Sequence, residues 1–371
     1  MPQLKTLIVD DTVVYRKILS EVLSAFPEIT LLGTAPNGDI ALKKIALNVP
    51  DLVFLDVHMP GMDGVEVLRR IQQQYPSIAV VMISSISSRS TADTVEALQL
   101  GAVDFIRKPD GSDQKHNTDY LSKEIKAVLN LVKIRLRSSV LVSSGTHRVK
   151  PPPPPSIPTV RKTALLPSSF SICVIGISTG GPEALGKLIP ALPFDFPLPV
   201  LIVQHMPPMF TRSLADSLNK KSKLHVTEAG EGDQIAKGTA YIAPGGKHMI
   251  VRRKNEGVFL GLNDEPPENS CRPSVDVLFR SVAAQYPEQG ILALVLTGMG
   301  NDGLNGVRAL KRRKCYCLTQ SASSCVVYGM PRAVDEAGLT DRSFEIEEMA
   351  EAMNMIVRNP SGLKTSHMEH L

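Results

Sequence analysis

The amino-acid sequence predicts an α/β protein with two domains, an N-terminal (βα)5 unit and a C-terminal doubly wound α/β unit that carries a β insertion. Both halves alternate short apolar runs with amphipathic helical patterns, which is typical of parallel sheets covered by helices. The length of 371 residues exceeds the roughly 100–200 residues of one domain. A basic Ser/Pro-rich stretch with a proline run at 151–155 predicts a semi-rigid spacer between the halves. The predicted parts are 1–125 (first domain), 126–168 (linker), 169–358 (second domain) and 359–371 (flexible tail).

Five apolar runs in the first domain predict five buried strands. They lie at residues 6–10, 29–35, 52–56, 79–84 and 103–108. Helical patterns follow these runs and begin near Thr12, Asp39, Asp63, Thr91 and Asp119. The carboxyl ends of parallel strands form one edge of the sheet, and doubly wound folds carry their functional residues there.

The second domain begins with the same alternation and then becomes rich in strands. Its predicted strands lie at 171–176, 198–205, 291–298 and 315–320, and its predicted helices follow the first two strands, occupy 273–286 and begin again at Asn301. The stretch at 223–262 contains short apolar runs without a helical pattern, which predicts the β insertion.

The charge distribution argues against a nucleic-acid-binding protein. The net charge is +4, but eight Lys/Arg and no Asp/Glu lie between residues 125 and 182, so the remainder carries −4 (+4 minus +8). No apolar run reaches the roughly 18 residues of a membrane span, and the N-terminus lacks a signal peptide, so we expect a cytoplasmic protein without membrane insertion. The odd number of cysteines predicts no disulfide framework, and Cys315 and Cys317 lack the second Cys/His pair of a metal site.

Three carboxylates follow neighbouring strands of the first domain. Asp10 and Asp11 end the first strand and Asp56 ends the third, so the fold predicts that they share one pocket. Like charges at this spacing require a cation, and oxygen ligands of high charge favour Mg²⁺. Ser84 and Lys108, at the ends of the fourth and fifth strands, complete a pocket able to hold a phosphoryl group on Asp56. Taken singly, each Asp is better explained as a helix N-cap or a turn residue, and it is the agreement of five strand ends that favours the pocket.

Three residues at strand ends of the second domain have the chemistry of a nucleophile, a base and its orienting acid. Ser178 lies in a Gly-rich turn, His205 ends the next strand, and Asp302 lies in a later Gly-rich turn. A serine whose proton passes to a histidine held by a carboxylate is the arrangement of acyl transfer. A hydrogen-bonded structural histidine and an N-capping aspartate are the competing interpretation. His225 and His248 are rival bases, but they lie in the β insertion, away from the predicted strand ends.

The first domain resembles the receiver domain of two-component response regulators, which is flavodoxin-like. The matching motifs are VDD at 9–11, LDVHMPGMDG at 55–64, MISS at 82–85 and FIRKP at 105–109. The resemblance implies phosphorylation of Asp56 by a histidine kinase, with Mg²⁺ bound beside it. The implied Mg²⁺ ligands are Asp10, Asp11, Asp56 and the backbone carbonyl of His58, and the implied phosphoryl contacts are Ser84 and Lys108. Phe105 stands where receivers usually carry a switch aromatic, although an ordinary core residue would look the same.

The second domain resembles the catalytic domain of the chemotaxis protein-glutamate methylesterases, the CheB family. The matching motifs are GISTGGPEAL at 176–185, QHMPPMFTRSLADSL at 204–218, YIAPGGKHM at 241–249, RPSVDVLFRSVA at 272–283, LTGMGNDG at 296–303 and GMPRAVDEAGL at 329–339. Together with the receiver, the resemblance covers nearly the whole chain in the family's domain order. Only the linker and the tail lack family motifs.

The CheB resemblance implies hydrolysis of glutamate γ-methyl esters on chemoreceptors to glutamate and methanol, and in many members deamidation of receptor glutamines. The implied triad is Ser178, His205 and Asp302, without a cofactor in the catalytic domain. The backbone N–H of Met299 would be an oxyanion donor, and Thr179 would support the nucleophile. The family also implies that the unphosphorylated receiver covers the catalytic cleft. Arg212 and Met206 would line that cleft.

Two other classes of output are less compatible with the sequence. A DNA-binding output needs a short helical domain with a basic recognition helix, whereas the second domain reads as α/β and the basic residues lie in the linker. A phosphorylation-dependent receptor-binding adaptor would need no triad residues, and all three are present. A generic hydrolase output would leave the receiver unexplained.

Overall fold

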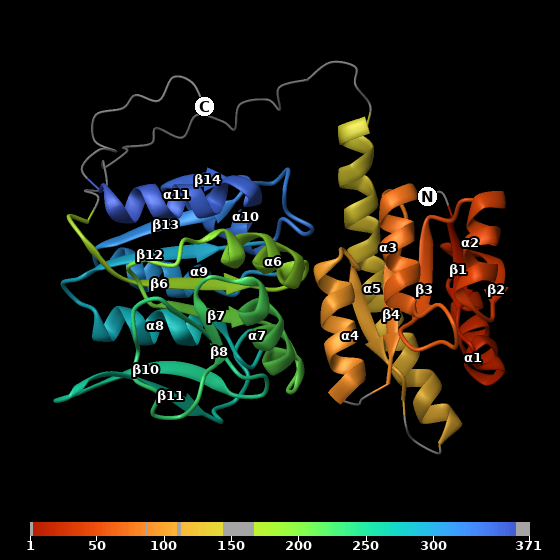
Figure 1. Ribbon diagram of the computed structural model, residues 1–371, viewed down its shortest axis with the longest axis horizontal. Coiled ribbons are helices and arrows are strands. Elements are labelled where there is room, and N and C mark those ends of the chain that lie inside the picture. Colours follow the sequence, from red (N-terminus) through yellow and green to blue (C-terminus); the bar gives the residue numbers. More distant parts are fainter. Residues whose placement is uncertain (1–2, 86–87, 110–112, 144–166, 361–371) are drawn as a thin grey trace.

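The computed structural model describes residues 3–85, 88–109, 113–143 and 167–360, which form two α/β domains lying side by side (Figure 1). The predicted proline run at 151–155, and all of the predicted tail beyond residue 360, lie outside the described residues. Within the described residues, every helix is too short or too polar to cross a lipid bilayer.

The N-terminal domain contains one five-stranded parallel sheet with the order β2-β1-β3-β4-β5. Its strands are β1 (Leu4–Val9), β2 (Ile29–Ala35), β3 (Leu52–Asp56), β4 (Ala79–Ser84) and β5 (Asp104–Arg107). Its helices are α1 (Val13–Ser24), α2 (Gly38–Leu47), α3 (Gly64–Gln74), α4 (Ser88–Gln99) and α5 (Gln114–Ser143). This arrangement confirms the predicted (βα)5 fold.

Helix α5 is longer than the sequence reading allowed. It begins ahead of Asp119 and ends at Ser143, so residues 126–143, which we assigned to the linker, are helical. The physical reason is an apolar face that continues past residue 125, with Leu129 and Val132 buried against the sheet. The ion pair of Lys133 with Glu28 (2.8 Å) also ties this part of the helix to the domain. The change in charge at residue 125 therefore does not mark the end of the folded domain.

The C-terminal domain contains a seven-stranded parallel sheet and a separate antiparallel hairpin. The sheet has the order β14-β13-β12-β6-β7-β9-β8, formed by β6 (Phe170–Ile177), β7 (Val200–Gln204), β8 (His225–Glu228), β9 (Thr239–Ile242), β12 (Gly290–Val295), β13 (Cys315–Gln320) and β14 (Arg342–Phe344). The hairpin is β10 (His248–Lys254) and β11 (Gly257–Asn263). The helices are α6 (Gly181–Ala191), α7 (Phe210–Lys221), α8 (Val275–Gln285), α9 (Leu304–Lys311), α10 (Met330–Glu336) and α11 (Ile346–Arg358).

The doubly wound fold is confirmed, and the β insertion is smaller than predicted. Strands β8 and β9 pair in parallel with each other and with β7, so they extend the main sheet, and only β10 and β11 lie outside it. Short apolar runs predict strands but not their partners, because pairing depends on contacts between distant segments.

Both sheets reverse their strand order at the positions that carry the predicted site residues. In the first sheet the reversal lies between β1 and β3. Asp10 and Asp11 follow β1 directly, and Asp56 is the last residue of β3. In the second it lies between β6 and β12, and Ser178 follows β6 directly. Crevices at such reversal points are where doubly wound sheets bind ligands.

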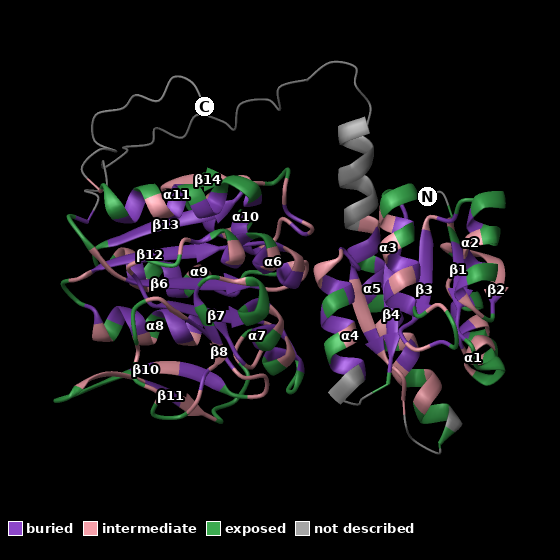
Figure 2. Ribbon diagram, viewed as in Figure 1, coloured by how far each residue is buried: buried purple, intermediate pink, exposed green. Residues whose placement is uncertain are grey.

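The two domains contact each other through α4 on one side and α6 and α7 on the other (Figure 1). The Phe105 and Phe210 rings stack across the contact with centroids 4.5 Å apart. Gln99 Oε1 accepts hydrogen bonds from Ser217 Oγ (2.8 Å) and Lys221 Nζ (2.6 Å). One hydrophobic cluster includes buried residues of both domains, and buried segments occur on both sides of the contact in Figure 2.

Candidate active site and phosphorylation site

The structure brings the three carboxylates of the N-terminal domain together. Oxygen atoms of Asp10, Asp11 and Asp56 lie within 4.8 Å of one another at the carboxyl ends of β1 and β3. Lys108 Nζ lies 2.8 Å from Asp10 Oδ2 and 2.8 Å from Asp56 Oδ2. Lys108 is the only Lys or Arg side chain that forms an ion pair with these carboxylates among the described residues.

The electrostatics of this pocket favour binding of a divalent cation. Burial raises the pKa of Asp56 to about 6, and the charges of Asp10 and Asp11 add to the effect, although Lys108 opposes it. For Lys108, burial lowers the pKa, but the two carboxylates outweigh this and the pKa is raised. Three carboxylates facing one ammonium leave an excess of negative charge, and hard oxygen ligands are those that Mg²⁺ prefers. The residues present therefore fit a magnesium ion.

The other predicted residues of the pocket lie at the expected strand ends. Ser84 ends β4, where its hydroxyl donates to the Ser85 carbonyl (3.1 Å) and accepts from Thr94 Oγ1 (2.9 Å). Lys108 follows β5, and its N–H donates to the Ser84 carbonyl (2.8 Å). His58 lies just beyond β3, with its ring Nε2 3.7 Å from Asp93 on α4.

In the C-terminal domain, Ser178 occupies a tightly constrained turn between β6 and α6. Its N–H donates to the Thr297 carbonyl (2.9 Å), and its carbonyl accepts from the Gly181 N–H (2.8 Å). A Cβ at Gly298 would lie only 2.7 Å from the Cβ of Ser178, so a side chain at that position would displace the serine. Gly180 has φ +77°, a conformation that glycine adopts without strain.

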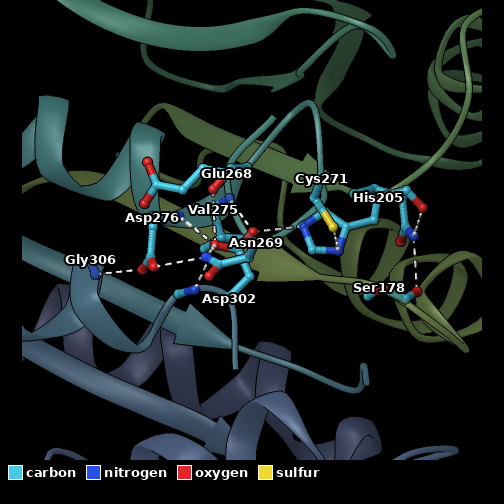
Figure 3. Close-up of polar contacts among 12 residues, drawn as sticks. Ser178, His205, Glu268, Asn269, Cys271, Val275, Asp276, Asp302 and Gly306 are labelled. Atoms are coloured by element: carbon cyan, nitrogen blue, oxygen red, sulfur yellow. Dashed lines mark hydrogen bonds and ion pairs between the residues drawn. The ribbon is translucent and has the colours of Figure 1, made fainter. Parts of the chain in front are cut away.

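His205 and Asp302 form the predicted pair. His205 Nε2 lies 2.8 Å from Asp302 Oδ2, and both side chains are largely buried (Figure 3). Asp302 also accepts hydrogen bonds from Asn269 Nδ2 (2.9 Å), Ser274 Oγ (2.9 Å) and the N–H groups of Val275 (2.7 Å), Asp276 (3.1 Å) and Gly303 (3.0 Å). Asp302 therefore does cap a helix, but it is α8, which is distant in sequence, and the same carboxylate contacts His205.

These contacts move the pKa values of the pair apart. Burial alone would raise the pKa of Asp302, but the hydrogen bonds from His205 and the backbone lower it to about 2. Burial likewise works against a charged His205, yet the hydrogen bonds with Asp302 and Cys271 raise its pKa to about 9. The carboxylate therefore stays ionised and stabilises an imidazolium, which is the role of the acid in a triad.

The other ring nitrogen of His205 faces a cysteine. Cys271 Sγ lies 3.5 Å from His205 Nδ1, and Figure 3 shows this contact beside the bond to Asp302. The hydroxyl of Ser178 has no hydrogen-bond partner among the described residues. Because Nε2 is held by Asp302, a proton from the nucleophile has to pass to Nδ1, the nitrogen that faces Cys271 in this structure. The structure thus forms the acid–base pair and places the serine in the same cavity without joining it to the base.

Of the supporting residues predicted around the nucleophile, Thr179 and Met206 line the same cavity as Ser178, whereas Arg212 lines a separate pocket beside α4. The N–H of Met299 donates to no acceptor in the described part of the chain, and the Met299 side chain is 57% exposed. The carbonyl of Thr179 accepts a hydrogen bond from Thr297 Oγ1 (2.9 Å). Met206 is buried next to His205, whereas the side chain of Arg212 is 75% exposed and lies 4.0 Å from Glu228.

His248 lies in the hairpin, as expected from its place in the β insertion, but the sequence did not reveal that it supports Asp302 through Ser274. His248 is fully buried, and its Nδ1 accepts the N–H of Ser274 (3.1 Å), the residue whose hydroxyl binds Asp302. His225, by contrast, lies exposed at the start of β8. The roles of Cys271 and Asn269 were also missed. Their position immediately before the RPSVD motif was the available signal, but the sequence shows no reason for that loop to reach His205.

A cavity of about 430 Å³ lies between the two domains and is lined by residues of both. Its lining from the C-terminal domain includes Ser178, Thr179, His205 and Met206, and its lining from the N-terminal domain includes Asp104, Phe105, Arg107 and Glu124. The N-terminal domain therefore roofs the cavity that contains the serine and the histidine.

The fold and the two sites define a class of protein: a receiver domain joined to an α/β domain with the residues of a serine hydrolase. Residues 6–126 match the response regulator receiver domain family, and residues 173–353 match the CheB methylesterase family. The chain is 42% identical to a protein-glutamate methylesterase/protein-glutamine glutaminase of Desulfotalea psychrophila, over 95% of this chain and 98% of that protein. It is 43% identical to a protein of the same name from Trichodesmium erythraeum, with the same coverage.

Among solved structures, the catalytic domain of the Thermotoga maritima CheB methylesterase is similar, with 40% identity and a TM-score of 0.50. That similarity covers 51% of this chain and all of the Thermotoga domain. The chain belongs to the CheB methylesterase family, and it contains the family's receiver domain.

Proposed function

We propose that this protein is a chemotaxis methylesterase that hydrolyses γ-methyl esters of glutamate on chemoreceptors, and that it also deamidates receptor glutamines. The observation that carries the proposal is the buried His205–Asp302 pair (2.8 Å) in the cavity that also contains Ser178. An ester and an amide of the same side chain differ only in the leaving group, so one acyl-transfer site serves both reactions.

In the proposed reaction Ser178 Oγ attacks the ester carbonyl and its proton passes to His205 Nδ1. Asp302 stabilises the imidazolium through Nε2, and the free N–H of Met299 donates to the developing oxyanion. His205 then returns the proton to the departing methoxide, which leaves as methanol, or to the departing amine, which leaves as ammonia. A water molecule, activated by the same histidine, hydrolyses the acyl-serine and releases glutamate.

The proposed regulation begins in the receiver pocket. Mg²⁺ would be held by Asp10, Asp11, Asp56 and the backbone carbonyl of His58, where it neutralises charge during phosphoryl transfer. Asp56 accepts the phosphoryl group from a histidine kinase. Ser84 and Lys108 then contact the phosphoryl oxygens, which withdraws Lys108 from its present ion pairs.

The proposed coupling runs from β5 to the catalytic domain. Lys108 follows the strand that carries Phe105, and Phe105 stacks on Phe210 at the start of α7. The domain contact also roofs the cavity of Ser178. We infer that the structure represents the covered state, and that phosphorylation loosens the contact so that the open state becomes more populated. The proposed partners are chemoreceptors and a chemotaxis histidine kinase, both reached from the cytoplasm.

The substitution Ser178→Ala tests the proposed nucleophile. Methanol release from methylated chemoreceptor membranes should fall by at least about 10³-fold while the melting temperature stays unchanged, because the small side chain replaces only the hydroxyl. Release within a few-fold of the wild type would exclude Ser178 as the nucleophile. Thr227→Ala on β8 is a suitable control, since it removes a partly buried hydroxyl far from the cavity.

A further inference from the structure

Gln204 is a buried amide between the two residues that the proposed reaction brings together. It ends β7, pairs in register with Ile177 of β6, and immediately precedes His205. Its side chain is almost completely buried, with 1% of its surface exposed. The two strands carry the serine loop and the histidine loop, so Gln204 lies at the point where those loops diverge.

The side-chain amide of Gln204 links the two loops directly. Its Nε2 donates to the backbone carbonyl of Ser178 (2.9 Å) and to the backbone carbonyl of His205 (3.2 Å). An amide nitrogen has two hydrogens, and here each is directed to one of the two residues. Since the group is shielded from water, no solvent molecule replaces either bond if the amide is lost.

The oxygen of the same amide packs against the start of α6. Gln204 Oε1 has no hydrogen-bond partner among the described residues, although it is buried. A Cβ placed on Gly181 would lie 1.8 Å from this oxygen, so the oxygen rests against the first residue of α6. The positive end of the helix dipole compensates part of the cost of an unpaired oxygen. This position is available only because residue 181 is glycine.

We propose that Gln204 is a positioning residue that sets the distance and orientation between Ser178 and His205. Gln204 lies along the cavity that contains both residues, but its amide is bonded to their backbone carbonyls, so it acts through the backbone of both residues. Small misplacements of a nucleophile relative to its base reduce rate on the order of 10²-fold. The reaction that Gln204 would assist rests on the proposed function, whereas the hydrogen bonds of Gln204 do not depend on the identity of the substrate.

The test compares the full-length wild type with Gln204→Met, Gln204→Glu and a control, Gln72→Glu. Gln72 lies half-buried on α3 of the N-terminal domain and donates its amide to the Gly101 carbonyl (3.4 Å), not to a proposed catalytic residue. Two rates are measured: methanol release from methylated receptor membranes, and inactivation by diisopropyl fluorophosphate, which reports serine reactivity without receptor binding. Circular dichroism and the melting temperature report folding.

For Gln204→Met we expect kcat and the inactivation rate to fall by on the order of 10²-fold, with KM changed less than three-fold. For Gln204→Glu, only the protonated acid donates to a carbonyl, so its activity relative to wild type should recover as the pH is lowered. Gln72→Glu should keep both rates within three-fold of the wild type.

Three results would overturn the inference: unchanged kcat in a folded Gln204→Met, an equal loss in Gln72→Glu, or a pH-independent ratio of the activity of Gln204→Glu to that of the wild type. If Gln204→Met does not fold, the pH dependence of Gln204→Glu decides. If the wild type releases no methanol, the proposed function fails, and the inactivation rates still decide the role of Gln204.

Discussion

Replacing Asp56 by asparagine should stabilise the receiver domain in the absence of metal. The structure raises the pKa of this buried carboxyl from 3.8 to about 6, chiefly through desolvation. At about 1.4 kcal/mol per pKa unit, the ionised side chain costs about 3 kcal/mol of folding free energy at neutral pH. Asparagine has nearly the same shape and no charge, so Asp56→Asn should recover most of that amount, because the pKa of about 6 already includes the opposing contribution of Lys108.

The pH dependence of this effect has a defined sign. Between pH 3.8 and about 6 the unfolded chain loses the Asp56 proton while the folded chain keeps it, so the wild type loses stability as the pH rises through this window. The difference in unfolding free energy between Asp56→Asn and the wild type should therefore be near zero below pH 3.8 and reach its full value above about pH 6. Calorimetric melting of the full chain in EDTA, from pH 3.5 to 8, measures it.

Mg²⁺ provides the matching control, because it binds the ionised pocket. Millimolar Mg²⁺ should raise the melting temperature of the wild type at pH 7.5 and have a much smaller effect on Asp56→Asn. A variant no more stable than the wild type in EDTA at pH 7.5 would refute the reasoning. So would an equal response of both proteins to Mg²⁺.

Three further predictions concern the catalytic domain and its contact with the receiver. The value of kcat/KM should rise with pH, with a midpoint near the pKa of His205, about 9, because only the neutral imidazole accepts a proton. Asp302→Asn should lower this midpoint. A wild-type midpoint near the ordinary histidine pKa of 6.5 would contradict the prediction. Phe210→Ala removes the stacking on Phe105, which is worth about 1 kcal/mol, and should raise the activity of the unphosphorylated protein about five-fold. An unchanged basal activity would show that this stacking does not restrain the enzyme. Ellman's reagent should modify one thiol in the folded chain, Cys271, since the other four cysteines are buried. The modification should abolish methanol release in the wild type, and the reagent should leave the activity of Cys271→Ala unchanged. Modification of Cys271 without loss of activity would contradict its placement against His205.

The sequence was most informative where function depends on strand ends. Residues such as Asp10, Asp56, Ser178 and His205 follow apolar runs that form parallel strands, and the topology of a doubly wound sheet brings such ends to one edge. The convergence of the three receiver carboxylates follows from this rule alone, and the structure places them within 4.8 Å.

The contacts that the sequence could not reveal join segments far apart along the chain. Gln204 precedes His205 in an ordinary strand pattern, and only the folded structure shows its amide bridging to Ser178. His248 begins a hairpin strand, yet it supports Asp302 through Ser274, because the hairpin packs against the start of α8. The parallel pairing of β8 and β9 is a further example, since apolar runs carry no information on their partners.

The central claim is that a receptor methylesterase is switched by phosphorylation of its receiver, and methanol release tests it most directly. The full chain is incubated with methylated chemoreceptor membranes, with and without acetyl phosphate and Mg²⁺, alongside Asp56→Ala. Methanol release should rise several-fold with the phosphodonor in the wild type and stay at the basal rate in Asp56→Ala. Absence of methanol under every condition would contradict the substrate, and equal stimulation of both proteins would contradict the switch.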